Sequence, residues 1–384
     1  MISESVKRKP IELGMHWFPQ GGGGADRYLH GLVCAMQSNG LQPKTIVFGK
    51  PDPSLSDVRI LPMASLPARL WAIRKAAVAA SAECSGRLIA SHFALYALPV
   101  IDMLKRHSFV VHFHGPWAEE SKAERASAVA VAVKHMVERQ VYHAADRLIT
   151  LSQAFADILV QDYAVEPSRV TVIPGGVDTS AFRGDEDRRA ARSLLKWPQD
   201  RRIVLAVRRL RRRMGIELLI DAAALVRQRD PECLFLIAGV GDERPALERR
   251  IIDLQLQDHV RLIGFVPDAE LASAYRAADC TVMPSIALEG FGLAAVESLA
   301  AGTPCLGTPV GGLPEALMPL DPRLVFRDVS VEAIAQGLLD WFASPTVTRD
   351  QCQTYARERF DWNVVLPKVL AVYDEAIATH TMLK

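Results

Sequence analysis

The sequence predicts an α/β protein with two domains, each built around a doubly wound parallel sheet. Short apolar runs alternate with longer Ala- and Leu-rich stretches of helical period along the whole chain. This alternation is typical of parallel strands joined by helices. The alternation occurs twice, and 384 residues are too many for one hydrophobic core. We therefore expect two Rossmann-like sheets that face each other across an interdomain cleft.

Apolar composition places the strands of both domains. In the first half, helical stretches such as 25–39 and 128–144 follow the strands. The expected strand segments there are IELGMHWF, PKTIVFG, RLIASHF, SFVVHFHG, RLITLS and RVTVIPGGV. Those of the second half are RIVLAVRRL, CLFLIAGVG, VRLIGFV, CTVMPS, TPCLGTPVGG and RLVF.

The domain boundary is expected in the polar, charged stretch GVDTSAFRGDEDRRAARSLLKWPQDRR. We place residues 1–185 in the first domain and 186–361 in the second. The final segment, 362–384, reads as a helix that is interrupted near Pro367 and packs back on the first domain.

Composition excludes several classes of protein. Lys and Arg (45) balance Asp and Glu (44), so the chain lacks the basic surplus of a nucleic-acid-binding protein. No window approaches about 20 apolar residues, and the first residues hold no secretion signal, so we expect a cytoplasmic protein. The six cysteines form no C-x-x-C pair, which argues against disulfides and a metal site.

Two loops of the first half follow predicted strands. In PQGGGGADRYLHGL, Gly21 to Gly24 precede a helix, where backbone N–H groups favour an anion. A merely flexible turn is the alternative. In VVHFHGPW, we expect His114 to lie at the carboxyl end of a strand with a role in the site, and His112 to point the other way and pack.

An arginine cluster follows the first strand of the second half, in the segment LAVRRLRRRMG. Like charges this close repel one another unless an anion neutralises some of them. Because guanidinium groups suit phosphate oxygens, we favour a diphosphate ligand over a solvated surface. The cluster consists of Arg208, Arg209, Arg211, Arg212 and Arg213.

Two carboxylates, Glu289 and Glu297, flank the turn in PSIALEGFGLAAVESLAAGTPCLGTPVGG. Eight residues of helix would separate them by about 12 Å, more than the carboxyl pair of a retaining glycosidase. They read instead as acceptors for different hydroxyls of one extended ligand. With the arginines and glycines, they predict a nucleotide sugar as the ligand.

The chain resembles the retaining glycosyltransferases of family 4, which have the GT-B fold. The second half carries the resemblance in VRRLRRRMGIELLIDA, LFLIAGVGDE, VRLIGFVPDAELASAYRAAD and the E-x7-E motif EGFGLAAVE. The first half adds GGGGADRYLHGL, HFHG and VIPGGVDTSAF. The resemblance implies an acceptor-binding first domain, a nucleotide-sugar-binding second domain, and transfer of a hexose from a UDP- or GDP-sugar with retention of configuration.

The resemblance also implies roles for single residues. Glu289 would hold the hydroxyls of the donor sugar, Glu297 the ribose and Arg209 the diphosphate, and His114 would lie beside the sugar. The glycines Gly22, Gly23 and Gly24 would approach the phosphates or the acceptor, and Val266 would line the base pocket. The turn that assists Glu289 consists of Gly290, Phe291, Gly292 and Leu293.

One position departs from the family pattern. Met214 stands where the family usually has a lysine, so we expect Arg212 or Arg213 to supply the missing charge. Guanidinium groups and amides would then stabilise the departing diphosphate without a metal ion or a further cofactor.

Several alternatives stay open. If no acceptor is used, the chain is instead a sugar-nucleotide epimerase of the same fold or a nucleotide-sugar-binding protein without activity. A dehydrogenase is disfavoured because the dinucleotide signature is missing. The acceptor is a saccharide, a lipid-linked sugar or a small molecule, in exopolysaccharide, lipopolysaccharide or glycolipid assembly. The segment 69–88, with Arg69, Trp71, Arg74 and Lys75, suggests peripheral contact with the inner face of the membrane, or an ordinary surface helix.

Overall fold

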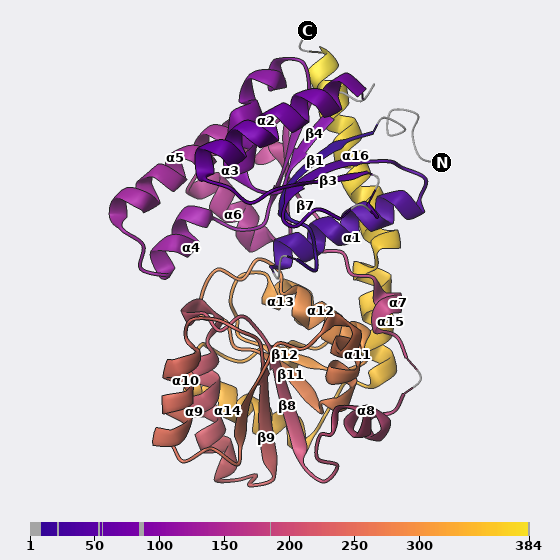
Figure 1. Ribbon diagram of the computed structural model, residues 1–384. Helices are drawn as coiled ribbons and strands as arrows, with labels where there is room; N and C mark the ends of the chain where they lie inside the picture. The colour runs from indigo at the N-terminus through magenta and orange to yellow at the C-terminus, as the bar shows by residue number, and fades with distance from the viewer. Residues whose placement is uncertain are drawn as a thin grey trace. The chain divides into compact units, whose positions relative to one another are not determined.

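The computed structural model describes residues 9–20, 23–52, 54–55, 57–83, 88–184 and 186–382 (Figure 1). The chain divides into two compact units. Unit 1 comprises Met1–Gly176 and Trp362–Lys384, and unit 2 comprises Val177–Asp361. The chain enters unit 2 at Val177, at the start of the polar stretch in which we expect the boundary and before residue 186, because Val177 already forms a β-bridge with Asp361 and donates its N–H to the carbonyl of Phe360.

The sheet of unit 1 has the strand order β3-β2-β1-β4-β5-β6-β7 among the residues that the structure describes. All of these neighbours are parallel. The order reverses between β1 and β4, which is a topological switch point. The strands are β1 (Ile11–His16), β2 (Lys44–Phe48), β3 (Val58–Leu61), β4 (Leu88–Ser91), β5 (Ser108–Phe113), β6 (Arg147–Thr150) and β7 (Val170–Val172).

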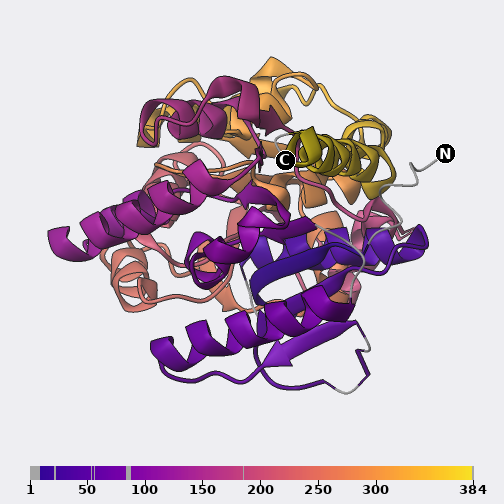
Figure 2. The same ribbon diagram turned by 90° about the horizontal axis from the view of Figure 1, so that it is seen from above.

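Helices cover both faces of this sheet, and Figure 2 shows the strands between the yellow helix α16 and the purple helix α2. α16 packs on α1, β5 and β6. The helices of unit 1 are α1 (Gly24–Ser38), α2 (Leu66–Glu83), α3 (Ala94–Ala97), the 3-10 helix η1 (Leu98–Lys105), α4 (Trp117–Ala123), α5 (Ala128–Ala144), α6 (Gln153–Gln161), the 3-10 helix η2 (Pro167–Arg169) and α16 (Trp362–Met382).

The sheet of unit 2 has the order β10-β9-β8-β11-β12, again with parallel neighbours. Its order reverses between β8 and β11. The strands are β8 (Arg202–Val207), β9 (Cys233–Ala238), β10 (Val260–Gly264), β11 (Cys280–Met283) and β12 (Cys305–Gly307).

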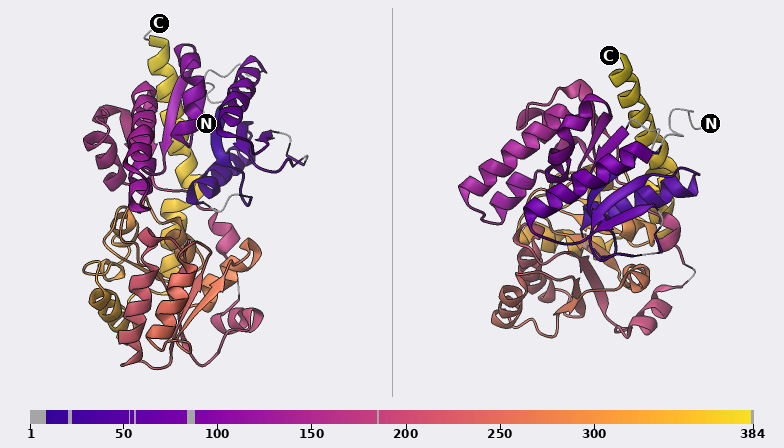
Figure 3. Two further views of the ribbon diagram at one scale, coloured as in Figure 1. Left: turned by 60° about the vertical axis from the view of Figure 1, so that its left-hand side comes forward. Right: turned by 45° about the horizontal axis from the view of Figure 1, so that its top comes forward.

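The helices of unit 2 also lie on both faces of their sheet (Figure 3). α9 packs against α14 and α10, and α12 packs against α15 and α11. The helices are α7 (Thr179–Phe182), α8 (Arg188–Leu195), the 3-10 helix η3 (Arg212–Met214), α9 (Ile216–Arg227), α10 (Arg244–Asp253), α11 (Asp268–Ala277), α12 (Leu293–Ala300), α13 (Leu313–Leu317), the 3-10 helix η4 (Pro322–Leu324), α14 (Val331–Ala343) and α15 (Arg349–Phe360).

Three details differ from the sequence prediction. The edge strand β3 was not predicted, since VRIL has only four residues and one of them is an arginine. The predicted strand RLVF is instead the end of η4 followed by a single bridge from Val325 to Gly307. α16 runs through Pro367 without a break. Proline removes one backbone hydrogen bond there, and the buried neighbours Leu366 and Val369 keep the helix packed.

Trp362 anchors α16 to unit 1. Its indole ring lies between two glycines, Gly31 of α1 and Gly176. A Cβ atom built on either glycine would lie 2.5 Å from the ring, so only residues without a side chain leave room for it. The ring also packs edge-to-face on Tyr28, and 7 % of its surface is exposed.

We predict that Trp362→Ala lowers the free energy of unfolding of unit 1 by about 3–5 kcal/mol, because it leaves a cavity at this contact. Urea unfolding followed by circular dichroism measures the change. Trp71→Ala is the matched control, since that side chain is 65 % exposed, and it should change stability little. Equal effects of the two substitutions would contradict this account of α16.

Candidate functional site

Arg208 and Glu289 meet at the topological switch point of unit 2. Arg208 directly follows β8, and Glu289 lies in the loop after the neighbouring strand β11. The Arg208 guanidinium forms an ion pair with the Glu289 carboxylate, and both side chains are nearly buried. Adjacent parallel strands bring their carboxyl ends to one edge of the sheet, which explains how residues 81 positions apart come together.

Ser285 completes this ion pair. Its hydroxyl donates to Glu289 Oε2 at 2.8 Å and accepts from Arg208 Nη2 at 2.8 Å. Burial by itself would raise the pKa of Glu289, but Arg208, Ser285 and Arg213 outweigh this effect and hold the pKa below its usual value. Glu289 is therefore ionised at neutral pH and accepts hydrogen bonds only.

Two glycines let neighbouring loops approach this pair closely. Gly239 after β9 has φ = +142°, and a Cβ there would lie 1.8 Å from the carbonyl oxygen of Arg208. Gly311 after β12 has φ = +56°, and its Cβ would lie 1.9 Å from the carbonyl oxygen of Glu289. Only glycine fits either position. The loop after β9 therefore packs against the backbone of the loop after β8, and the loop after β12 packs against the backbone of the loop after β11.

The arginines of the cluster separate into different environments. Arg208 Nη2 lies 2.7 Å from Sδ of Met214, the position at which we expect Arg212 or Arg213 to replace a lysine. Arg213 is buried and donates to the carbonyl of Leu288 at 2.9 Å, and Arg212 is exposed. Arg209 is also exposed, at the carboxyl end of β8.

Arg208 is thus the residue that sequence reasoning missed. It was counted in the cluster without a role of its own, yet its guanidinium reaches both Met214 and Glu289. A signal was present in the sequence, since Arg208 immediately follows the strand and a long side chain there can fold back over the next loop.

The turn before α12 presents backbone rather than side chains. Phe291 is buried edge-to-face against Phe360, with ring centroids 5.3 Å apart, and Gly290 and Leu293 are partly exposed. Gly292, with φ = +83°, begins the helix at its N-cap. Backbone N–H groups at such a helix start favour anions and hydroxyl oxygens.

Glu297 lies inside α12 and is almost fully buried. The hydroxyl of Tyr275, from α11, donates to Glu297 Oε2 at 3.0 Å. Glu289 and Glu297 therefore have different surroundings: one is paired with a guanidinium, and the other accepts from a tyrosine. Val266 is half-buried beyond β10, at the same carboxyl edge of the sheet.

In unit 1, His114 follows β5 and its Nε2 lies 3.0 Å from Nδ1 of His92, which follows β4. His92 Nε2 lies 3.0 Å from Oε2 of Glu12, inside β1. The rings of His92 and His112 are stacked with centroids 4.3 Å apart. The expectation that His112 points away from His114 is wrong, because residues two apart on a strand share a face.

Burial lowers the pKa of His114 well below its usual value, with a further contribution from His92. The pKa of His112 is lowered in the same way by burial, His92 and His114. Both rings are therefore neutral at pH 7. His112 is 2 % exposed, whereas His114 is partly exposed.

The glycine loop of unit 1 lies beyond β1, on the same edge of the sheet. Gly23 is the N-cap of α1 and Gly24 its first residue. Gly21 and Gly22 lie outside the described residues. Asp26, in the first turn, accepts from the backbone N–H of His16 at 3.1 Å and so holds the end of β1 against the helix.

One group among the described residues has the geometry to hold a metal ion: Glu12, His92 and His112, whose ligand atoms lie within 4.8 Å of one another. Two of the three residues also contact Tyr373, which donates to Glu12 at 3.0 Å and lies 2.8 Å from His112 Nε2. The absence of a metal requirement stays a prediction.

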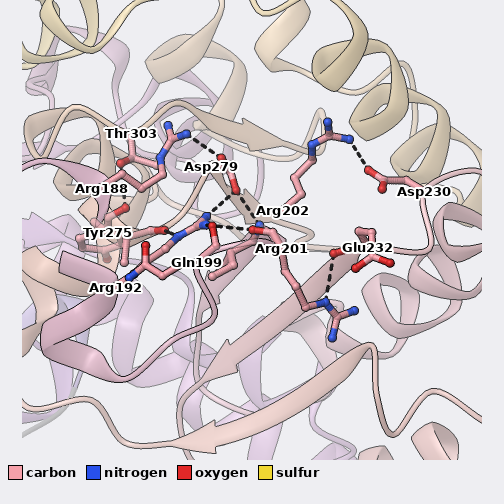
Figure 4. Close-up of polar contacts among 12 residues, drawn as sticks. Arg188, Arg192, Gln199, Arg201, Arg202, Asp230, Glu232, Tyr275, Asp279 and Thr303 are labelled. Carbon is pink, nitrogen blue, oxygen red and sulfur yellow. Dashed lines mark hydrogen bonds and ion pairs between the residues drawn. The ribbon is translucent and has the colours of Figure 1, made fainter. Parts of the chain in front are cut away.

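Two hollows of unit 2 lie at the opposite, amino-terminal end of the strands. Part of their wall is a structural ion-pair network (Figure 4). Asp279 accepts from Arg188 at 2.7 Å, from Arg192 at 2.8 Å and from the backbone N–H of Ile203 at 2.6 Å. Arg192 also donates to the carbonyl of Ala277. These guanidinium groups join α8 to the sheet, so we place the functional site at the other end.

The face of α2 has mixed contacts. Arg69 donates to the Tyr96 hydroxyl at 2.8 Å and Arg74 pairs with Asp102, while Trp71 and Lys75 are exposed. The pairing of both arginines within unit 1 gives no specific support to membrane contact, which stays a prediction. No helix in the described part of the chain is long and apolar enough to span a bilayer.

Comparison with known proteins agrees with this geometry. Residues 22–181 match the family described as Glycosyltransferase Family 4, and residues 187–359 match Glycosyl transferases group 1. The chain belongs to the family 4 glycosyltransferases. Their GT-B fold agrees with the two parallel sheets of the structure.

Among curated relatives of this glycosyltransferase, the D-inositol 3-phosphate glycosyltransferase of Streptomyces avermitilis is 34 % identical over 260 residues, which are 65 % of this chain and 56 % of the relative. The protein of Streptomyces scabiei with the same name is 33 % identical over 260 residues, 65 % of this chain and 58 % of that relative. The chain thus spans little more than half the length of these relatives.

Solved structures share the fold of this glycosyltransferase. Sucrose-phosphate synthase from Thermosynechococcus elongatus has a TM-score of 0.79 at 24 % identity and covers 97 % of this chain and 100 % of its own. The Anabaena protein HepE in complex with UDP-glucose has a TM-score of 0.76 at 20 % identity, with 95 % and 99 % covered.

We predict that stability falls as the pH is lowered below about 6.5, in part because His112 is protonated in the unfolded chain but stays neutral in the fold. Its contribution approaches about 1.4 kcal/mol per pH unit. Urea unfolding at pH 7.5, 6.5 and 5.5 measures the slope. His112→Gln should flatten it, and an unchanged slope in that variant would contradict the buried neutral ring.

Proposed function

We propose that the protein is a retaining hexosyltransferase that moves a hexose from a UDP- or GDP-sugar to an acceptor hydroxyl without a metal ion. The observation that carries the proposal is the ionised Glu289 beside Arg208 at the switch point of unit 2. An ionised carboxylate accepts sugar hydroxyls, and guanidinium groups bind a diphosphate. Unit 2 then holds the donor, and unit 1 holds the acceptor.

The roles of the single residues follow from this assignment. Glu289 accepts hydroxyls of the sugar, with the backbone of Gly290, Phe291, Gly292 and Leu293 beside it. Arg209 and Arg208 neutralise the diphosphate, with Arg212 and Arg213 near them. In the site without ligand Arg208 pairs with Glu289, so the diphosphate competes with Glu289 for its guanidinium. Glu297 binds the ribose, and Val266 lines the base pocket.

The chemical step depends on how well the site stabilises the negative charge of the leaving group. As the bond between the sugar and the nucleoside diphosphate breaks, negative charge grows on the bridging oxygen. Once the donor is bound, the guanidinium groups and backbone N–H groups around the diphosphate stabilise this charge, and they act in place of a metal ion. The acceptor oxygen forms its bond to the sugar on the face that the diphosphate leaves, which retains the configuration, and the hydroxyl proton passes to an oxygen of the leaving diphosphate. His114 contacts the transferred sugar, and the loop of Gly22, Gly23 and Gly24 approaches the acceptor or the phosphates.

The similar proteins are consistent with such substrates. One solved neighbour was crystallised with UDP-glucose, and the first curated relatives are named for an inositol phosphate acceptor. We propose a polyhydroxylated acceptor, a saccharide, a lipid-linked sugar or a small molecule, used in polysaccharide or glycolipid assembly. The reaction takes place in the cytoplasm, with peripheral contact at the membrane if the acceptor is lipid-linked.

The test of the function is turnover with a panel of UDP-, GDP- and ADP-sugars, with and without EDTA. We expect one donor to raise the melting temperature and to be consumed rapidly only when an acceptor is added. Consumption without acceptor would favour the epimerase, and binding without turnover would favour an inactive binder. Glu289→Gln should lower turnover by roughly 100-fold and leave the affinity for the free nucleotide nearly unchanged. Unchanged turnover with a weakened affinity for the nucleotide would contradict the assignment of Glu289 to the sugar hydroxyls.

We predict that Arg209→Ala weakens binding of the nucleoside diphosphate by about 2–3 kcal/mol, as expected for loss of a charge-assisted contact. Isothermal titration calorimetry measures the affinity. The matched control is Arg202→Ala, at the other end of β8, where the guanidinium pairs with Asp230. Unchanged affinity in Arg209→Ala, or equal losses in both variants, would refute the diphosphate site.

A further inference from the structure

Glu12 is a fully buried carboxylate in the middle of β1, and the proposed reaction does not use it. Both of its oxygens are occupied. The hydroxyl of Tyr373, from α16, donates to Oε1 at 3.0 Å, and Nε2 of His92 lies 3.0 Å from Oε2. A carboxylate in the interior needs hydrogen-bond donors at its oxygens, and these two contacts provide them.

Each of the two groups that contact Glu12 also contacts a further histidine. His114 Nε2 lies 3.0 Å from Nδ1 of His92, and His112 Nε2 lies 2.8 Å from the hydroxyl of Tyr373. The network therefore has two arms that converge on one carboxylate. Nδ1 of His112 is buried and has no hydrogen-bond partner, so the arm through Tyr373 ends there.

The direction of each hydrogen bond follows from Glu12. An ionised carboxylate only accepts, so His92 must carry its hydrogen on Nε2 and the tyrosine must donate. In a neutral His92 ring, Nδ1 then has a lone pair, and the facing Nε2 of His114 must carry the hydrogen. Nδ1 of His114 is consequently an acceptor, on a ring that is partly exposed.

We propose that Glu12, acting through His92, is a positioning residue that keeps His114 neutral, with its hydrogen on Nε2 and a lone pair on Nδ1. Glu12 touches no substrate. The proposal rests on the proposed function for its consequence only: Nδ1 of His114 accepts a hydrogen bond from a hydroxyl of the transferred sugar.

The stacked rings reinforce this state. His114 and His92 are stacked with centroids 5.3 Å apart, and His114 and His112 with centroids 6.3 Å apart. A positive charge within this buried stack would be poorly solvated. Unit 1 therefore presents an uncharged acceptor, whereas the cations that we assign to the diphosphate belong to unit 2.

Replacing Glu12 should reverse the direction of the hydrogen bond between His92 and His114. In Glu12→Gln, Tyr373 donates to the amide oxygen, and the amide N–H faces Nε2 of His92. His92 then has to move its hydrogen to Nδ1, which donates to Nε2 of His114, and His114 carries its own hydrogen on Nδ1. Tyr373→Phe is the matched control, because it removes one hydrogen bond from the same carboxylate and leaves the His92 arm intact.

The test is the imidazole nitrogen resonances of the full chain labelled with ¹⁵N-histidine, which distinguish protonated from unprotonated nitrogens. We expect His114 to carry its hydrogen on Nε2 in the wild type and in Tyr373→Phe, and on Nδ1 in Glu12→Gln. If Glu12→Gln fails to fold, His92→Phe keeps a ring in the stack and should release His114 into a mixture of both forms. An Nδ1–H form of His114 in the wild type, or no change in either variant, would overturn the proposal.

Kinetics provide a second readout. Glu12→Gln should lower kcat/KM by about tenfold, as for loss of one hydrogen bond, while the affinity for the free nucleotide is unchanged. If the resonances change as expected but the wild type has no transferase activity, the proposed function fails and the role of Glu12 stands. A stoichiometric metal ion bound to Glu12, His92 and His112 would overturn that role.

Discussion

A carboxylate in the interior has to be compensated by donors close to it, and this constraint shapes both units. Each unit has a buried acid near the point where the strand order reverses: Glu12 in β1 and Glu289 after β11. Both groups are largely removed from water, so the surrounding chain supplies hydrogen bonds to their oxygens. The loops and helices around each acid are arranged to bring those donors.

The two acids solve this problem in different ways. Glu289 is paired with a cation, Arg208, and in the function that we propose a diphosphate attracts Arg208 away, so that the pair exchanges partners. Glu12 is bonded to Tyr373 and His92, which are neutral donors in the arrangement that we propose. The first arrangement places positive charge where we propose that an anionic ligand binds. The second, in our proposal, sets the direction of the hydrogen bonds that lead to His114.

The sequence predicted the architecture well because strand–helix alternation depends on local composition. It also located the loops, since a parallel strand always ends at the same edge of its sheet. The side-chain pairing was out of reach: whether Arg208 or Arg213 turns toward Met214 depends on the path of the loop. Glu12 and Tyr373 are 361 positions apart, and no local pattern connects them. β3 and the end of η4 were missed because segments as short as these take their structure from their neighbours.

Unit 2 lies in the chain between the two segments that make up unit 1. A ribosome therefore completes β8 to β12 and their helices while unit 1 still lacks α16. Until that helix is synthesised, the nascent sheet exposes the surface against which Trp362 packs, and Glu12 lacks the hydroxyl of Tyr373. The unit whose translation begins first is then the last to be complete, and a chain that stalls before its final helix carries a finished unit 2 and an incomplete unit 1.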